Sequence, residues 1–128
     1  MEKKIIITDK LPVSGPYSTA VEANGFIFLS GQLPIDPATG EIISEIRHAT
    51  RQVLVNIRTV LADTGLSLSS IVKTTIFLKD ISDFAAVNEI YAGFFPQEPP
   101  ARSTIEVSNL PKGAPLEIEA IATRKQRG

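Results

Sequence analysis

The chain has 128 residues, of which 43% are hydrophobic, and its 13 basic and 14 acidic side chains leave a net charge of -1. This length suits one domain with one core, and a near-neutral chain has no overall field that would draw it to nucleic acid or an anionic membrane. Because cysteine is absent and histidine occurs once, disulfides, thiolate nucleophiles and the usual zinc sites are excluded, and we expect one soluble cytoplasmic domain over residues 1–128 with no metal.

Three strands are predicted at the N-terminal end. The first, Ile5–Ile7, is far too short an apolar run for a signal peptide or a membrane span. The next two cover residues 21–23 and 26–29, because Asn24-Gly25 between them tolerates the positive φ values of a type I′ hairpin turn. Gly31 is then expected to break the third strand.

Helical spacing of apolar residues begins at Ile46 and predicts a helix that stops where Gly65 takes the left-handed C′ conformation. Residues 71–78 are rich in β-branched and aromatic side chains, which is typical of a buried strand. A second helix follows, with Ser82 or Asp83 as its cap and prolines at its end. Its apolar stripe comprises Phe84, Val87, Tyr91, Phe94 and Phe95.

Residues 103–107 and 116–123 are predicted as the last two strands. The resulting order, β-β-β-α-β-α-β-β, lacks regular βαβ alternation and indicates an α+β sheet of about six strands with both helices on one face. The other face is uncovered, and in the last strand Glu117 and Glu119 share it with Ile121. Such a mixed face is suited to contact between identical subunits, so we expect a homo-oligomer.

Several common catalytic arrangements are missing from the sequence. The single histidine, His48, lies in the first helix with no strained nucleophile turn nearby, so we expect it to be a solvated helix residue. Neither Gly31 nor Gly40 fits a phosphate-binding loop that opens a helix with lysine. The remaining candidates are polar residues at the edges of strands.

Arg102 and Glu117 are the charged candidates. Arg102 follows Pro99-Pro100 at the start of a strand, so its backbone is rigidly placed, and its guanidinium suits a planar carboxylate. The alternative is a surface arginine paired with a glutamate of the last strand. Glu117 can position or deprotonate a water if a partly desolvated cleft raises its pKa, and its alternative is a rim or interface glutamate.

The uncharged candidates each have a structural alternative as well. Tyr17 follows a glycine-proline turn that would present its hydroxyl at a loop tip, or it is a packing tyrosine. Ser30 and Gly31 end a strand, where glycine permits close approach of the backbone to a ligand or a simple bulge. Asn88 lies on the inner side of the second helix, where an amide normally belongs to a structural network.

A series of motifs in chain order closely resembles the Rid (reactive intermediate deaminase, YjgF-type) family, and especially its archetypal 2-iminobutanoate/2-iminopropanoate deaminase branch. The resemblance covers nearly the whole chain. The motifs that carry it include Gly15-Pro16-Tyr17-Ser18, Ser30-Gly31-Gln32-Leu33-Pro34, Thr39-Gly40-Glu41, Asn56, residues 72–80, Phe84, Val87-Asn88, Tyr91, Pro100-Ala101-Arg102-Ser103, Leu110-Pro111-Lys112 and residues 117–122.

The resemblance implies a chorismate-mutase-like fold, assembled as a homotrimer with a central barrel and three clefts between subunits. It implies hydrolysis of 2-aminoacrylate, 2-iminopropanoate and 2-iminobutanoate to 2-keto acids and ammonia, with no cofactor. Arg102 would hold the carboxylate of the substrate and Glu117 would position a water. The residues that it implicates in catalysis or substrate binding are Arg102, Glu117, Tyr17, Ser30, Gly31, Asn88 and Thr104.

Two departures from the family pattern stand out. Thr104 occupies a position where many relatives have cysteine, so activity should survive if the family contact there is made by the backbone. The connection at residues 96–99 is also shorter than in some members. The alternative functions are a regulatory trimer that binds 2-keto acids without turnover, and an endoribonuclease or translation inhibitor, which the net charge and the single short basic segment at residues 124–127 disfavour.

Overall fold

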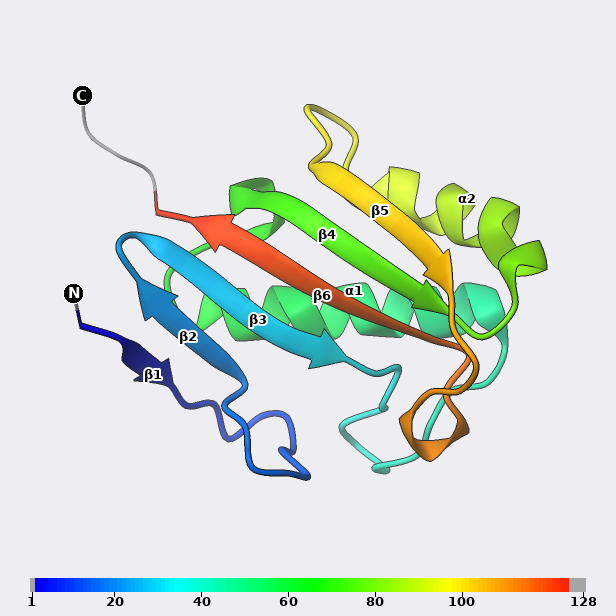
Figure 1. Cartoon of the computed structure of the whole chain (residues 1–128), viewed down its shortest axis with the longest axis horizontal. Coiled ribbons are helices and arrows are strands. Elements are labelled where there is room, and N and C mark those ends of the chain that lie inside the picture. Colours follow the sequence, from blue (N-terminus) through cyan, green and yellow to red (C-terminus); the bar gives the residue numbers. More distant parts are fainter. Residues whose placement is uncertain (1, 125–128) are drawn as a thin grey trace.

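The computed structural model describes residues 2–124 and contains one mixed sheet of six strands with two α-helices against one face (Figure 1). In chain order the elements are β1 (Lys4–Ile6), β2 (Ala20–Ala23), β3 (Phe26–Gln32), α1 (Ile46–Ala62), β4 (Ile71–Leu78), α2 (Phe84–Phe94), β5 (Ala101–Glu106) and β6 (Leu116–Thr123). The strand order is β1-β2-β3-β6-β4-β5, and only the β4–β5 pair is parallel. The α+β prediction is confirmed.

Helix α1 forms where the apolar spacing predicts it. Its buried stripe packs on the sheet, and the side chain of Glu45 caps its first turn by accepting from the backbone N–H groups of Arg47 and His48. At the other end Gly65 has φ +80°, and the N–H of Leu66 donates to the carbonyl of Leu61 at 2.9 Å. This 6→1 bond confirms the predicted glycine-terminated helix end. His48 is exposed, also as predicted.

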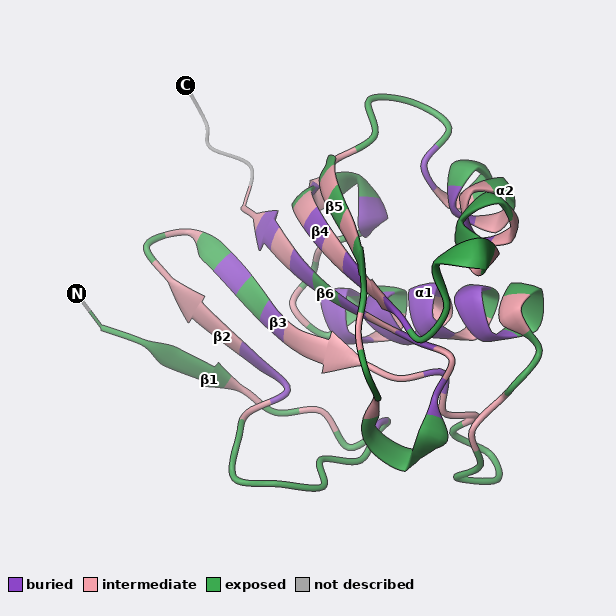
Figure 2. Cartoon of the chain, turned by 45° about the vertical axis from the view of Figure 1, so that its right-hand side comes forward, coloured by how far each residue is buried: buried purple, intermediate pink, exposed green. Residues whose placement is uncertain are grey.

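The two faces of the sheet differ sharply, as the alternation of buried and exposed bands along β3 shows (Figure 2). In β6 the side chains of Leu116, Ile118, Ala120 and Ala122 are buried toward the helices. The opposite face is not covered by any element within residues 2–124, and it exposes Phe26, Phe28 and Ile105, each more than 40% accessible. The predicted uncovered face is therefore present.

Several strand boundaries differ from the prediction: β1 is Lys4–Ile6 instead of residues 5–7, β2 begins one residue early, and β5 ends one residue early. Strand β3 does not stop at Gly31 but continues to Gln32, because a register shift between Leu29 and Gln32 lets β3 remain paired with β6. Strand β5 begins at Ala101, two residues early, since its parallel pairing with β4 already joins Ala101 to Lys73. The hairpin at Asn24-Gly25 is confirmed, with φ values of 54° and 82°.

The start of α2 also differs from the prediction. Neither Ser82 nor Asp83 caps it through a side chain. Asp80 instead caps a short 3₁₀ turn that leads into the helix, and its carboxylate accepts from the N–H of Ser82 at 2.9 Å. Phe84, which the sequence places in the buried stripe, is 41% exposed because it lies at the helix end beyond the core.

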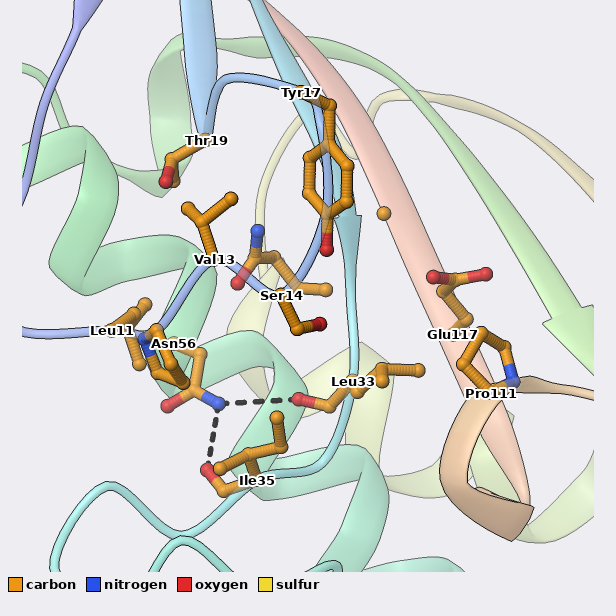
Figure 3. A pocket seen from close by; sticks show the side chains of 13 residues that line it. Leu11, Val13, Ser14, Tyr17, Thr19, Leu33, Ile35, Asn56, Pro111 and Glu117 are labelled. Carbon is orange, nitrogen blue, oxygen red and sulfur yellow. Dashed lines mark hydrogen bonds between the residues drawn. The ribbon is translucent and has the colours of Figure 1, made fainter.

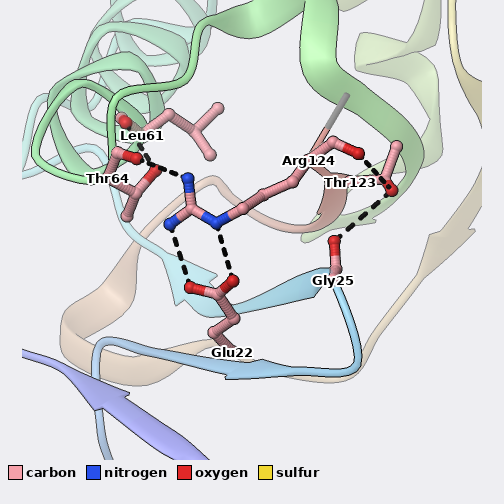
Figure 4. A network of polar contacts seen from close by, with 6 residues as sticks. All are labelled: Glu22, Gly25, Leu61, Thr64, Thr123 and Arg124. Carbon is pink, nitrogen blue, oxygen red and sulfur yellow. Dashed lines mark hydrogen bonds and ion pairs between the residues drawn. The ribbon is translucent and has the colours of Figure 1, made fainter. Parts of the chain in front are cut away.

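The end of β6 is fastened to two other elements through Arg124 (Figure 4). Its guanidinium forms two hydrogen bonds with the carboxylate of Glu22, at 2.6 and 2.9 Å, and a third with the carbonyl of Thr64 at 2.9 Å. The arginine lowers the pKa of Glu22. The rest of the predicted basic segment, residues 125–127, lies outside the described residues. No helix within residues 2–124 has the length and apolar character needed to cross a membrane.

Candidate functional site

Three of the candidate residues line one cavity of about 240 Å³ at the ends of β3 and β6. Tyr17 reaches it from the loop before β2 and Glu117 from β6 (Figure 3). Gly31 of β3 also lines it. Its apolar wall comes from Leu11, Val13, Leu33 and Ile35. The sequence therefore identified three residues that the fold does bring together.

Gly31 lies directly against the carboxylate of Glu117. A Cβ atom at position 31 would stand 2.6 Å from Oε2 and 2.7 Å from Cδ of that side chain, far inside van der Waals contact. The structural interpretation of this glycine as part of a bulge is confirmed by the register shift, and its close approach is to the side chain of Glu117.

The carboxyl group of Glu117 has a perturbed pKa. Partial burial raises the pKa of its carboxyl group, and the neighbouring charge of Glu119 raises it further. Within residues 2–124 none of the ion pairs includes Glu117. A carboxyl group with a raised pKa beside a cavity is better suited to accept and return a proton than an ordinary surface carboxylate.

A second group of candidates surrounds Arg102 on the helix side of β5. The Nη2 atom of Arg102 donates to Oδ1 of Asn88 at 2.6 Å. The guanidinium carbon lies 4.9 Å from the ring centroid of Tyr91 and 5.4 Å from that of Phe84, within the range of cation–π attraction. These contacts from α2 fix the guanidinium in place, and only one of its five N–H groups is used in them.

The alternative interpretation of Arg102, an ion pair with a glutamate of the last strand, is wrong for the described chain. Its side chain contacts α2 and not β6. Thr104 lies two residues further along β5, on the same face, and its Oγ1 is buried with no hydrogen-bond partner among the described residues. A buried hydroxyl normally has a hydrogen-bond partner, so Thr104 offers a free donor and acceptor beside Arg102.

Ser30 contributes differently from its neighbour. Its Oγ donates to the carbonyl of Ser18 at 2.6 Å, and its N–H donates to the carbonyl of Thr19 at 2.9 Å. Both bonds hold the loop that carries Tyr17 against β3. Ser30 itself is not among the residues that line the cavity.

Within one chain the two groups are well separated. Arg102 is in register with Thr74 of β4 and, through it, with Ala120 of β6, three residues from Glu117. Three residues along a strand span about 10 Å, and two strand spacings also span about 10 Å. Because these two displacements are perpendicular, the Cα atoms of Arg102 and Glu117 lie about 14 Å apart. Their side chains point to opposite faces of the sheet. The structure therefore does not bring Arg102 and Glu117 into one site of a single chain.

Two features of the site escaped the sequence interpretation. Phe84 and Tyr91 were assigned to the core, yet both flank the guanidinium of Arg102. Phe84 is four residues before Asn88 and Tyr91 is three residues after it. This spacing could have predicted the contact, because it places all three side chains on one face of a helix. Asn56 was noted only as part of a motif, and it lies at the floor of the cavity. No cluster of metal-ligating side chains occurs in the part of the chain that the structure describes.

Comparison with known proteins gives long matches. A family model described as Endoribonuclease L-PSP matches residues 7–124. A RutC family protein of Pyrococcus horikoshii is 50% identical over 125 residues, covering 96% of this chain and 99% of the relative. The 2-iminobutanoate/2-iminopropanoate deaminase of Escherichia coli is 44% identical over 126 residues, covering 95% and 98%, and the chloroplastic Reactive Intermediate Deaminase A of Arabidopsis thaliana is 50% identical over 125 residues, covering 96% and 67%.

Solved structures match over the same length. A Yersinia pestis protein of the conserved Rid protein family superposes with a TM-score of 0.92 at 49% identity, covering 96% of this chain and all of that one. Escherichia coli TdcF, solved with bound serine, superposes with a TM-score of 0.90 at 42% identity, covering 95% and 99%. The two groups of candidate residues thus lie within a fold shared along its whole length.

Proposed function

The chain belongs to the family described as Endoribonuclease L-PSP, and from this premise we propose that it hydrolyses small 2-imino acids and their enamine forms to 2-keto acids and ammonia. The candidate substrates are 2-aminoacrylate, 2-iminopropanoate and 2-iminobutanoate. The names of the relatives from Escherichia coli and Arabidopsis thaliana support this class of reaction. Two observations together carry the proposal. Asn88 orients the guanidinium of Arg102 so that its other N–H groups can bind a carboxylate, and Glu117, whose pKa is raised, lies beside a small cavity.

In the proposed reaction Arg102 binds the carboxylate of the substrate. A planar carboxylate accepts two parallel N–H bonds from a guanidinium, which fixes both the position and the plane of the substrate. Asn88 holds the guanidinium, and the hydroxyl of Thr104 and the backbone near Gly31 are proposed to complete the binding. This orientation supplies much of the rate acceleration, because a water and an imine carbon held in line react as one unit.

Glu117 is the proposed proton-transfer group. Its carboxylate takes a proton from a water as the water oxygen bonds to the imine carbon, giving a carbinolamine. The nitrogen is protonated, the C–N bond breaks and ammonia leaves as the carbonyl forms. Tyr17, on the same cavity, is proposed to orient the water or the nitrogen through its hydroxyl. The reaction adds one water, needs no oxidant or reductant and is proposed to need no cofactor.

The proposed site needs two copies of the chain. A four-carbon imino acid is about 5 Å long, so it cannot reach from Arg102 to Glu117 across the sheet of one chain. We infer a homotrimer in which the uncovered face forms a central barrel and each cleft combines Arg102 of one copy with Glu117 of the next. The exposed apolar residues of that face and the orphaned hydroxyl of Thr104 support such contacts.

The test is keto acid release in a coupled assay. A threonine dehydratase in excess generates 2-iminobutanoate faster than it hydrolyses unaided, so that hydrolysis is the slow step, and added protein is expected to accelerate formation of 2-oxobutanoate over buffer. Arg102→Lys is expected to lose most of this acceleration, because an ammonium cannot reproduce the two-point contact. Equal release with protein and with buffer would overturn the proposal, and 2-oxobutanoate bound without turnover would support the regulatory alternative.

A further inference from the structure

Asn56 lies on α1 and lines the same cavity as Glu117 (Figure 3). It is only 2% exposed. Its Nδ2 donates to two backbone carbonyls, that of Leu33 at 3.2 Å and that of Ile35 at 2.9 Å. Its Oδ1 accepts from Nε2 of Gln52 at 2.8 Å. Both amide hydrogens are thus used to fasten one segment of backbone to the helix.

That segment is a part of the cavity wall that lies beyond the ladder of the sheet. Residues 33–35 follow the end of β3, and Ile35 pairs with Ile42 through an isolated bridge instead of a continuous ladder. The carbonyl of Leu33 otherwise accepts from the N–H of Ile35 within the same turn, at 2.8 Å. The bonds from Asn56 therefore fix the distance between this segment and the helix.

The position of this segment determines the shape of the cavity. Leu33 and Ile35 both line it, and Leu33 is two residues from Gly31, which touches Glu117. Leu11 and Val13 complete an apolar wall on the side toward the N-terminal loop. A substrate whose imine carbon lies beside Glu117 would place an aliphatic side chain against this wall.

We propose that this cavity takes the aliphatic side chain of the 2-imino acid, and that Asn56 is a positioning residue that sets the width of the cavity by holding residues 33–35. The inference rests on the proposed function for the identity of the ligand. It makes size selectivity a property of the β3–α1 connection, separate from carboxylate binding by Arg102.

The experiment compares two 2-keto acids, 2-oxobutanoate and the bulkier 4-methyl-2-oxopentanoate, by titration calorimetry on the purified protein. Asn56→Asp keeps the volume of the side chain but places oxygen where the two donors were. The segment is then released, and the ratio of affinities is expected to change in favour of the bulkier acid by about fivefold, since one methylene in an apolar pocket is worth about tenfold or more. Gln52→Ala is the matched control, because it removes the partner of Oδ1 and leaves both bonds to the carbonyls.

An unchanged affinity ratio in folded Asn56→Asp protein would overturn the proposal, even if the variant melts at a lower temperature, because a purely structural amide alters stability without altering selectivity. An equal change of the ratio in Gln52→Ala would overturn it as well. If the aspartate variant does not fold, Asn56→Ser is measured in the same way and is held to the same expected and contrary results. The readout is binding, so a wild-type protein that binds keto acids but lacks turnover would refute the proposed reaction and leave this test intact.

Discussion

The contact between Gly31 and Glu117 gives a sharp prediction for the variant Gly31→Ala. The new methyl group would stand 2.6 Å from Oε2 of Glu117, whereas ordinary contact begins at 3.4 Å. The carboxylate must therefore move by about 0.8 Å, and a displacement of about 1 Å at a reacting group costs about 100-fold in rate. Turnover of 2-iminobutanoate is expected to fall by that order.

Stability should change little in the same variant. The atoms in the way belong to the end of a half-buried side chain, and the φ of Gly31 is not in the left-handed region, so no backbone strain arises. Overpacking of this kind costs about 1 kcal/mol in free energy of unfolding. The assays are coupled keto acid release and thermal unfolding, read on the same preparations.

Gly93→Ala is the matched control. A Cβ at position 93 meets nothing within 4 Å, and the residue lies in α2. Alanine is expected to stabilise the helix by about 0.5 kcal/mol and to leave turnover unchanged. Turnover of Gly31→Ala within about twofold of the wild type would refute the reasoning, because the carboxylate would then have moved without consequence.

Three further variants test other parts of the account. Glu117→Gln should abolish turnover and retain keto acid binding. Because burial raises the pKa of Glu117, protonation stabilises the folded state at low pH, and this stabilisation is lost as pH rises through the raised pKa. The variant should therefore melt above the wild type at pH 8 and close to it at pH 4, and a lower melting temperature at pH 8 would contradict this. Arg124→Ala should lower the melting temperature at pH 7 by about 4 °C, equivalent to about 1 kcal/mol in free energy of unfolding. This loss should become smaller as the pH falls through the lowered pKa of Glu22 and its carboxylate is protonated. A loss of melting temperature that does not depend on pH would argue against the ion pair. Phe28→Asp, on the uncovered face, should convert the proposed trimer to folded monomers in sedimentation analysis, and a variant that sediments as a trimer would place the interface elsewhere.

Much of the fold follows from local patterns in the sequence. The run at residues 71–78 becomes β4 with the predicted bounds, and Gly65 ends the first helix in the predicted conformation. Both depend on side-chain periodicity and on the backbone freedom of one residue type, which neighbouring residues in the sequence are enough to reveal. The approach to α2 depends instead on which of several acceptors reaches the backbone, and Asp80 caps the 3₁₀ turn that precedes the helix.

The arrangement of the site follows from long-range pairing that local patterns do not contain. The separation of Arg102 from Glu117 depends on β4 lying between β5 and β6 and on the register of both pairs. The contact of Gly31 with Glu117 depends on a register shift between β3 and β6. An apolar stripe likewise does not distinguish a core aromatic from one beside a cation, as Phe84 shows.

The central claim is that Arg102 of one copy and Glu117 of another serve the same cleft, and mixing two inactive variants tests it most directly. Arg102→Ala and Glu117→Gln are each expected to be inactive alone. When the two are co-refolded in equal amounts, every mixed trimer contains one cleft with both residues intact, so about one quarter of all clefts are complete. The account predicts recovery of about one quarter of the wild-type rate of keto acid release. No recovery from mixed trimers that sedimentation shows to have formed would contradict it, because every cleft would then depend on both residues of a single chain.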